Sequence, residues 1–420
     1  MKDSAPKASS DPTNVLKGES GRTGAGPHIL LYGQFGVGNS GNDATLLAAH
    51  EGLSKRLPDA RFTVVAGAPD VVERELGLSA VAISPEGRAS LLPKRIEQIA
   101  DEWRRTAHAR RVLRSADFFI VPGTGIFDDL NVTPIQHAFP MWRWCAQARS
   151  ARVPVLFVSV GAGPVEREAS RRLFAWTAAL ANWRSFRDQS SRAFVRDSLH
   201  VDVANDVVTP DLVFSLGLAT PAPAARRTIG VGVMGYHSWR GARGGGDDIY
   251  EDYMGKLAQF CAELIAQGDA IRVLLGDAGD LSAADDLVQR LRAQAPGAAV
   301  SVAPARDFRG ICAEVVQTDA VVATRFHTVL AALMCGRPVV SIGYAVKNRN
   351  IMTAFGLGAY CQDIWDYDPQ LLRAHFTALT ANPNKVYAQL RTVAEKLRGE
   401  VNVHLDALEA YIKSRARQPG

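Results

Sequence analysis

The chain has 420 residues, of which 47% are apolar and 22% are charged, an ordinary composition for a globular protein. Its 48 basic and 43 acidic residues give a net charge of +5, which favours acidic small molecules or an anionic surface and gives no reason to expect nucleic-acid binding. No apolar run approaches the roughly 20 residues of a membrane-spanning helix. At roughly 100–200 residues per domain, two or three domains are expected.

The start of the chain and the cysteines indicate the compartment. Residues 1–27 are small and polar, lack the apolar segment of a secretory signal, and are predicted to form a disordered tail. The cysteines lie far apart and form no C-x-x-C pair: Cys145, Cys261, Cys312, Cys335 and Cys361. We expect buried free thiols in a cytoplasmic protein, rather than a catalytic cysteine or a metal site.

Strands and helices are predicted to alternate through the first half of the chain. Strands are expected at 28–33, 61–67, 117–122 and 153–160, and helices at 43–57, 135–149 and 168–182. The strands at 117–122 and 153–160 are near-continuous apolar runs, which suit parallel strands covered on both faces.

A segment rich in Pro, Ala and Gly at 216–227 is predicted to be a linker. Strands follow at 228–234, 271–275, 319–323 and 338–342, helices near 250–267, 281–295, 307–317 and 326–335, and further helix over 368–415. The run Gly241–Gly246 is predicted to be a mobile loop. This pattern predicts an α/β protein with two Rossmann-like, doubly wound domains facing a cleft, at 28–215 and 228–375, followed by a helical segment at 376–420.

The first glycine-rich loop, residues 36–41, fits G-x-G-x-x-G between a strand and a helix. A dinucleotide site would also require an acidic residue at the end of the second strand, and the nearest acid there is Asp70. A tight turn is one alternative. The other is a turn whose backbone amides, with Asn39, Asn42 and Asp43, line a substrate cleft at a helix N-terminus.

Two more glycine turns follow apolar strands, at Gly123 and Gly125 and at Gly161 and Gly163. Ligands of open α/β sheets bind beyond the carboxyl ends of the strands, where all three turns are expected. We therefore predict that they form the floor of a cleft, although small residues also serve simply to permit close turns.

Arg325 and His327 lie two residues apart where a predicted strand turns into a helix. Arginine binds carboxylate or phosphate through a planar fork of N–H groups, and histidine exchanges protons near neutral pH. We predict that both point into the cleft; the alternative for the histidine is a structural hydrogen bond.

Three further charged residues are candidates for the same cleft. Arg187 is a possible second anion-binding group, or a salt-bridge partner of Asp188. Asp211 is either a helix N-cap or a cleft carboxylate, and Lys347 either reaches an anion or is solvated.

The segment 93–114 carries seven basic residues, with Ile96, Ile99 and Trp103 at helical spacing. A solvated amphipathic helix is one interpretation, and contact with an anionic membrane surface or a pyrophosphate-linked acceptor is the other. No H-E-x-x-H, paired Cys/His ligands or G-x-S-x-G occurs, so neither a zinc site nor a serine-hydrolase elbow is predicted.

From about Ile29 to Leu357 the sequence resembles the polysaccharide pyruvyl transferases. The motifs that carry the resemblance are GNSGNDA at 38–44, GAGP at 161–164, FRD at 186–188 with Ser191, RFH at 325–327, GRPVV at 336–340 and YAVK at 344–347. No single motif is specific, but their order and spacing together are.

The resemblance implies two facing Rossmann-like domains, similar to GT-B-type glycosyltransferases, with the acceptor on the N-terminal side and the donor on the C-terminal side. It implies transfer of a pyruvyl group from phosphoenolpyruvate, without a cofactor, onto two hydroxyls of a sugar in cell-surface or secreted polysaccharide biosynthesis. The acceptor would be a sugar, and a lipid-linked sugar at the inner face of the membrane is one form that it could take. The family's Arg-x-His motif matches Arg325 and His327, and its donor-binding Arg-Asp motif matches Arg187.

The chemistry would use His327 as an imidazolium to protonate the methylene carbon of the donor, while Arg325 and Arg187, with Lys347, answer its charge. Asp211 or Asp43 would assist deprotonation of the acceptor. Two other functions fit the same fold: a nucleotide-sugar glycosyltransferase, and a non-catalytic carbohydrate-binding protein.

Overall fold

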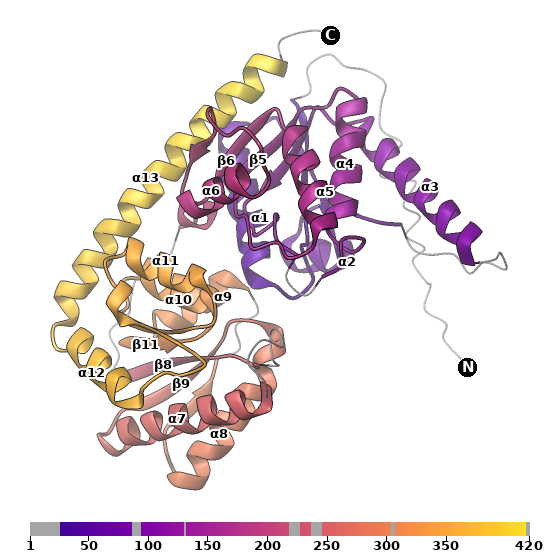
Figure 1. The fold of residues 1–420 in the computed structure, drawn as a ribbon. Helices are drawn as coiled ribbons and strands as arrows, with labels where there is room; N and C mark the ends of the chain where they lie inside the picture. Colours follow the sequence, from indigo (N-terminus) through magenta and orange to yellow (C-terminus); the bar gives the residue numbers. More distant parts are fainter. Residues whose placement is uncertain are drawn as a thin grey trace, which may run out of the picture.

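A computed structural model describes residues 26–85, 94–129, 132–217, 227–236, 246–303 and 307–416. Most of the predicted tail, of the predicted linker and of the predicted Gly-rich loop lies outside the described residues. The described part of the chain forms two α/β lobes, with the N-terminal lobe in indigo to magenta and the C-terminal lobe in orange (Figure 1).

The N-terminal lobe is built on a parallel sheet of seven strands in the order β3-β2-β1-β4-β5-β6-β7. Its strands are β1 (His28–Gly33), β2 (Arg61–Ala66), β3 (Ala80–Ala82), β4 (Phe118–Pro122), β5 (Val155–Val160), β6 (Trp183–Phe186) and β7 (Val207–Val208). The helices are α1 (Ser40–Arg56), α2 (Pro69–Val71), α3 (Lys94–Leu113), α4 (Ala138–Ser150), α5 (Glu168–Ala179) and α6 (Gln189–Asp197), and a 3-10 turn, η2 (Leu212–Ser215), follows.

The C-terminal lobe repeats this arrangement with a parallel sheet of six strands in the order β10-β9-β8-β11-β12-β13. Its strands are β8 (Thr228–Val233), β9 (Ala270–Leu275), β10 (Val300–Val302), β11 (Ala320–Ala323), β12 (Val339–Gly343) and β13 (Cys361–Asp363). The helices are α7 (Gly246–Ala266), α8 (Leu281–Gln294), α9 (Phe308–Val315), α10 (Phe326–Met334), α11 (Val346–Ala354) and α12 (Pro369–Thr380).

Every residue of β1, β4, β5, β11 and β12 is buried, as expected for central parallel strands covered by helices on both faces. One apolar core cluster includes residues of both sheets, of α1 and of the C-terminal helix. The two lobes therefore share a continuous core.

The predicted C-terminal helical stretch divides at Ala381 and Asn382, and its second helix, α13 (Pro383–Ala416), runs along both lobes (Figure 1). Arg56 of α1 bonds Asp406 at 2.7 Å, and the Ser185 hydroxyl lies 2.9 Å from Nε2 of His404. Because α13 starts beside the C-terminal lobe and ends on the N-terminal one, its contacts connect the two lobes. No helix of the described residues is both long and apolar enough to cross a bilayer.

Candidate active site

The first glycine-rich loop connects β1 to α1 at the edge where the two lobes meet. Gly36 and Gly38 have φ of +74° and +87°, values that glycine adopts without strain. The Asn39 side chain caps α1 by accepting from the amides of Gly41 and Asn42, and Asp43 accepts from the Gly36 amide at 2.8 Å. Asn39 and Asp43 therefore shape the loop.

The N-terminus of α1 touches the other lobe directly. The Ser40 hydroxyl donates to the carbonyl of Gly276 at 2.7 Å, and Arg309 pairs with Glu51 at 2.6 Å. A Cβ added to Gly41 would overlap the imidazole of His327. The first turn of α1 thus packs on a histidine of the facing lobe, in the place where a dinucleotide fold would receive a phosphate.

His327 belongs to the first turn of α10, after β11. Its ring is partly buried and lies 5.3 Å, edge to face, from that of Phe326. Among the described residues, none forms a hydrogen bond with this ring. The imidazole is therefore not committed to a partner in the protein, although its Nε2 side packs against Gly41.

Arg325 is held by a carboxylate of its own lobe. Its Nε and Nη2 donate to the two oxygens of Asp280 at 2.8 and 2.6 Å, and Asp280 also accepts from the Gly235 amide. Asp280 has no exposed surface, and Arg325 is 14% exposed. One side of the planar fork is occupied by Asp280, which leaves the two hydrogens of Nη1 and one of Nη2 to bind an anion.

Arg187 crosses into the same region from the N-terminal lobe. It follows β6, and its guanidinium lies over Gly161, where a Cβ would come within 2.6 Å of Cζ. Its Nε is 3.6 Å from an oxygen of Asp188, which caps α6. This confirms the predicted ion pair with Asp188, although at a distance too long for a hydrogen bond.

Lys347 lies at the start of α11, with its Nζ 5.3 Å from the ring centres of both Phe326 and Tyr344. No carboxylate of the described residues pairs with it. Two aromatic faces hold the ammonium by cation–π attraction and leave its charge uncompensated by an anion.

The charges of Lys347, Arg325 and Arg187 all affect the pKa of one imidazole, that of His327. The pKa of His327 is lowered to about 3, first by burial and then by the charges of Lys347, Arg325 and Arg187. The ring is therefore neutral at pH 7 in the protein alone. A neutral imidazole among cations from both lobes is a site that favours an anion.

Asp211 caps η2 through the Val213 amide, which confirms that it is an N-cap. Burial raises its pKa, and the charge of Arg187 opposes this rise. It is thus also a carboxylate close to Arg187. Burial raises the pKa of Asp43 too, while Asn42 donates from its amide group to the carbonyl of Gln34.

The second and third glycine turns lie side by side, because β4 and β5 are neighbours. A Cβ on Gly123 would overlap Thr45, one on Gly125 would approach Asp128, and one on Gly163, at φ +77°, would approach Phe194. These glycines permit close packing of the loops.

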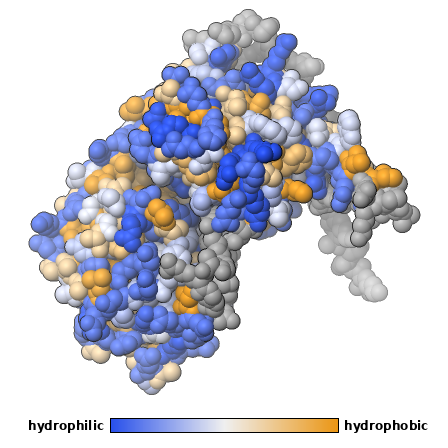
Figure 2. Space-filling model, in the orientation of Figure 1, coloured by the Kyte–Doolittle hydropathy of each residue, from blue (hydrophilic) through white to orange (hydrophobic). Residues whose placement is uncertain are grey.

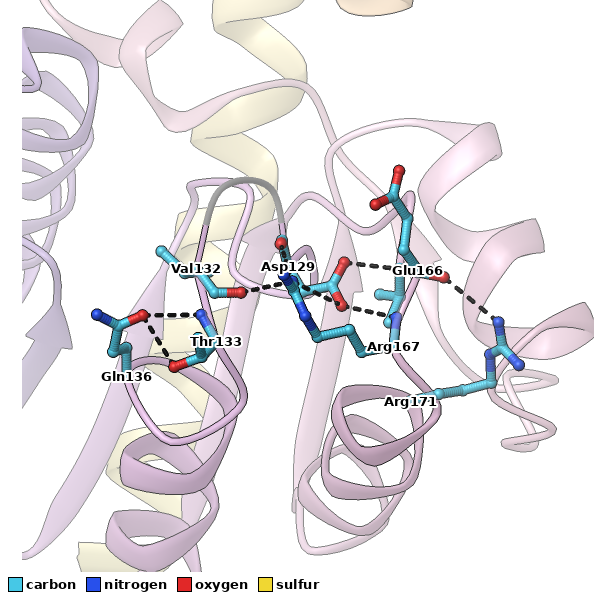
Figure 3. A network of polar contacts seen from close by, with 8 residues as sticks. Asp129, Val132, Thr133, Gln136, Glu166, Arg167 and Arg171 are labelled. Carbon is cyan, nitrogen blue, oxygen red and sulfur yellow. Dashed lines mark hydrogen bonds and ion pairs between the residues drawn. The ribbon is translucent and has the colours of Figure 1, made fainter. Parts of the chain in front are cut away.

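A buried carboxylate, Asp129, joins these two loops (Figure 3). It accepts from the amides of Glu166 and Arg167 at 2.8 and 2.9 Å, and the Arg167 side chain reaches back to the carbonyls of Asp129 and Val132. This edge of the N-terminal lobe is therefore fixed by charge-assisted hydrogen bonds.

Three polar residues of this region were not predicted from the sequence: Ser40, Asp280 and Asp129. Asp280 lies shortly after β9, so the rule that places ligands at strand ends would have included it. Ser40 and Asp129 bond backbone groups of distant segments, which no local pattern reveals.

All five cysteines are buried free thiols, as predicted. Within the part of the chain that the structure describes, no three His, Cys, Asp or Glu side chains gather closely enough to hold a metal ion.

Solved structures with the same two-lobed fold include UDP-N-acetylglucosamine 2-epimerases and glycosyltransferases. A putative UDP-N-acetylglucosamine 2-epimerase from Listeria monocytogenes has a TM-score of 0.60 and 12% sequence identity, over 93% of this chain and 98% of that one. The UDP-GlcNAc 2-epimerase of Neisseria meningitidis, bound to UDP-GlcNAc, has a TM-score of 0.53 and 11% sequence identity, over 91% of this chain and 99% of that one. The glycosyltransferase SnogD of Streptomyces nogalater has a TM-score of 0.51 and 17% sequence identity, over 92% of this chain and 99% of that one. At these identities the likeness concerns the GT-B fold.

No curated protein sequence matches the chain. The sequence model of one family, described as polysaccharide pyruvyl transferase, matches residues 39–345. This range begins at the cap of α1, includes Arg187, Arg325 and His327, and covers well over half of the chain. The chain belongs to the polysaccharide pyruvyl transferase family.

Proposed function

We propose that the protein transfers a pyruvyl group from phosphoenolpyruvate to two hydroxyls of a sugar, forming a cyclic ketal. The observation that carries this proposal is the imidazole of His327, free of hydrogen bonds to any described residue, beside cations from both lobes. Phosphoenolpyruvate offers a carboxylate and a phosphate to such a set.

The two cations best placed to bind the donor are Arg187 and Lys347. Neither is committed to a close hydrogen bond with a carboxylate: Arg187 is 3.6 Å from Asp188, and Lys347 rests on two aromatic rings. Arg325 adds its Nη1 group, while Asp280 fixes its position. Arg325 would therefore both bind the donor substrate and form part of the wall of the site.

His327 must receive a proton before it can act as an acid. The cations that lower its pKa are the groups that the donor neutralises, so donor binding raises the pKa of the ring. The second pKa of a phosphate monoester is about 6, so the donor itself can bring this proton. Substrate binding and acid activation are then coupled.

The bond changes follow from this arrangement. His327 gives its proton to the methylene carbon, which becomes a methyl group and leaves the neighbouring carbon electrophilic. One sugar hydroxyl attacks that carbon, the bond from the carbon to the phosphate oxygen breaks, and a second hydroxyl closes the ring. Of the two protons lost by the hydroxyls, one replaces that of His327 and the other leaves with phosphate.

Asp211 is the carboxylate to which we assign removal of a hydroxyl proton. Its pKa is raised by burial, and the charge of Arg187 acts on it. A carboxyl whose pKa moves towards neutrality is a better base. The chemistry itself requires no cofactor, and the acceptor would lie on the N-terminal lobe, whose loops Asp129 fixes.

The decisive experiment follows acceptor mass and phosphate release with phosphoenolpyruvate and a panel of free, nucleotide-linked and lipid-linked sugars. We expect a pyruvyl-ketal mass gain and one phosphate per transfer. His327→Gln should lower turnover by about 10²–10⁴-fold while the donor still raises the melting temperature. Stabilisation by nucleotide sugars and not by phosphoenolpyruvate would instead indicate a glycosyltransferase, and binding of sugars without either reaction a carbohydrate-binding protein.

A further inference from the structure

Helix α3 presents apolar side chains to solvent although the chain has a large core to bury them in. Ile96, Ile99 and Trp103 are 52%, 62% and 72% exposed. Spacings of three and four residues place them on one face of the helix. Figure 2 shows apolar surface at the projecting end of α3 (compare Figure 1). Such a contiguous apolar stripe marks an interaction surface.

The same face of α3 becomes basic towards its other end. Ala107 and Arg110 follow Trp103 on this face at the same spacing of three or four residues. Arg114, directly after the end of the helix, continues the spacing. Arg110 and Arg114, with Arg152, line an open cavity of about 530 Å³. Arg110 donates to the Gln147 amide oxygen at 2.7 Å and not to a carboxylate. The apolar stripe and the cavity thus follow one another along the same face, apolar and then basic.

The acids of α3 do not cancel this charge. The helix has six basic and three acidic residues. Asp101 pairs with Arg104, and Glu102 pairs with Arg143 of α4 at 2.5 Å. The local balance therefore remains positive.

This surface is carried by a helix that is docked firmly on the lobe. His108 lies 2.8 Å from the carbonyl of Ala82 and edge-on to Trp144, while Ala109, Val112 and Leu113 are buried against the body. The exposed face is therefore held in one orientation.

We propose that this face of α3 docks the protein on the surface of a membrane that contains anionic phospholipid. The apolar side chains would enter the boundary between headgroups and acyl chains, where tryptophan is favoured. The arginines would contact lipid phosphates, each adding to the attraction towards a negatively charged leaflet. Charge complementarity favours this occupant over a second copy of the chain, whose same face would be positive as well.

Vesicle flotation of the full-length protein tests this proposal, with phosphatidylcholine alone compared with phosphatidylcholine containing phosphatidylglycerol. We expect binding to the anionic vesicles that weakens with added salt. The triple variant Ile96→Ser/Ile99→Ser/Trp103→Ser should lose at least about tenfold in vesicle affinity. Arg110→Gln/Arg114→Gln/Arg152→Gln should lose roughly 100-fold on anionic vesicles at low salt and little on neutral ones.

Matched controls come from the other lobe and from α13. Leu281→Ser/Leu371→Ser/Val403→Ser removes apolar side chains that are 43% to 68% exposed, and Lys385→Gln/Arg391→Gln/Lys396→Gln removes three exposed charges. Both controls should bind as the wild type does, and unchanged melting temperatures show that all variants fold. Absence of binding to anionic vesicles would overturn the proposal, as would a dimer that the Ile96/Ile99/Trp103 variant converts to monomer.

Discussion

Gly41 and His327 face each other across the two lobes, and the imidazole fills the space that a side chain at position 41 would occupy. The helix that begins at Ser40 therefore supports the imidazole from the N-terminal lobe, although His327 belongs to the C-terminal one. Glycine at this position is required for contact and not for backbone conformation, since its φ is not positive. The site depends on how the lobes are set against each other.

Gly41→Ala should displace His327 or separate the lobes, because the added methyl group and the ring cannot share one space. Misplacement of a reacting group by about 1 Å can cost on the order of 10²-fold in rate. We expect a comparable fall in kcat for pyruvyl transfer. The matched control is Gly255→Ala, also in a helix but with no atom near the added Cβ. Full activity in Gly41→Ala would show that the ring position is unimportant.

The charges around His327 can be tested on the histidine itself. Lys347→Met and Arg187→Gln each remove a positive charge that lowers the pKa of the ring, so that pKa should rise. Because burial is the larger cause, it should stay below its ordinary value of 6.5. Histidine NMR titration measures the shift, and the KM for phosphoenolpyruvate should rise at least about tenfold. Lys385→Met is the control; the same His327 pKa in all variants would contradict the proposed cluster.

Much of the fold could be predicted because its central strands are long apolar runs. The strand predicted at 28–33 is β1 with the same bounds, and 61–67, 117–122 and 153–160 differ from β2, β4 and β5 by at most two residues at an end. The strands Ala80–Ala82, Val300–Val302 and Cys361–Asp363 were not predicted. Three residues are too few to show a periodicity, and these strands form only where a neighbour supplies hydrogen bonds.

The candidate site was less accessible to sequence reasoning. The turn from a predicted strand into a helix located Arg325 and His327, the resemblance added Arg187 as a donor-binding residue, and the charges of both arginines lower the pKa of His327. That Arg325 is held by Asp280 could not be foreseen, because the partner lies 45 residues away on another strand connection. The neutral state of His327 depends on burial between the lobes, which only the three-dimensional arrangement creates.

Asp280→Ala should destabilise the fold and weaken donor binding together. The variant leaves Arg325 largely buried without its partner, which typically costs about 3–5 kcal/mol. Asp286→Ala is the control, since it removes a similar hydrogen-bonded arginine pair, with Arg290, that is about one-quarter exposed on each side. There we expect at most about 1 kcal/mol. Urea unfolding measures both; equal losses would show that burial of the Asp280 pair has no energetic consequence.

His404 should make stability depend on pH through α13. Burial lowers its pKa to about 4, against an ordinary 6.5, while its Nε2 lies 2.9 Å from the Ser185 hydroxyl, which accepts from the Ser159 amide. As pH falls from 6.5 to 4, the unfolded chain binds a proton that the folded one does not. Stability is therefore retained above pH 6.5 and decreases by roughly 3 kcal/mol towards pH 4.

His404→Gln should be less stable than the wild type near neutral pH and lose less stability on acidification, because it removes one of the groups that drive the loss. His327, with a pKa of about 3, contributes in the same direction and remains in the variant, so the dependence is reduced and not abolished. Urea unfolding at several pH values between about 7.5 and 5 measures the difference. His200→Gln changes an exposed ring and should follow the wild type; equal slopes in all three proteins would mean that His404 is protonated in the folded state.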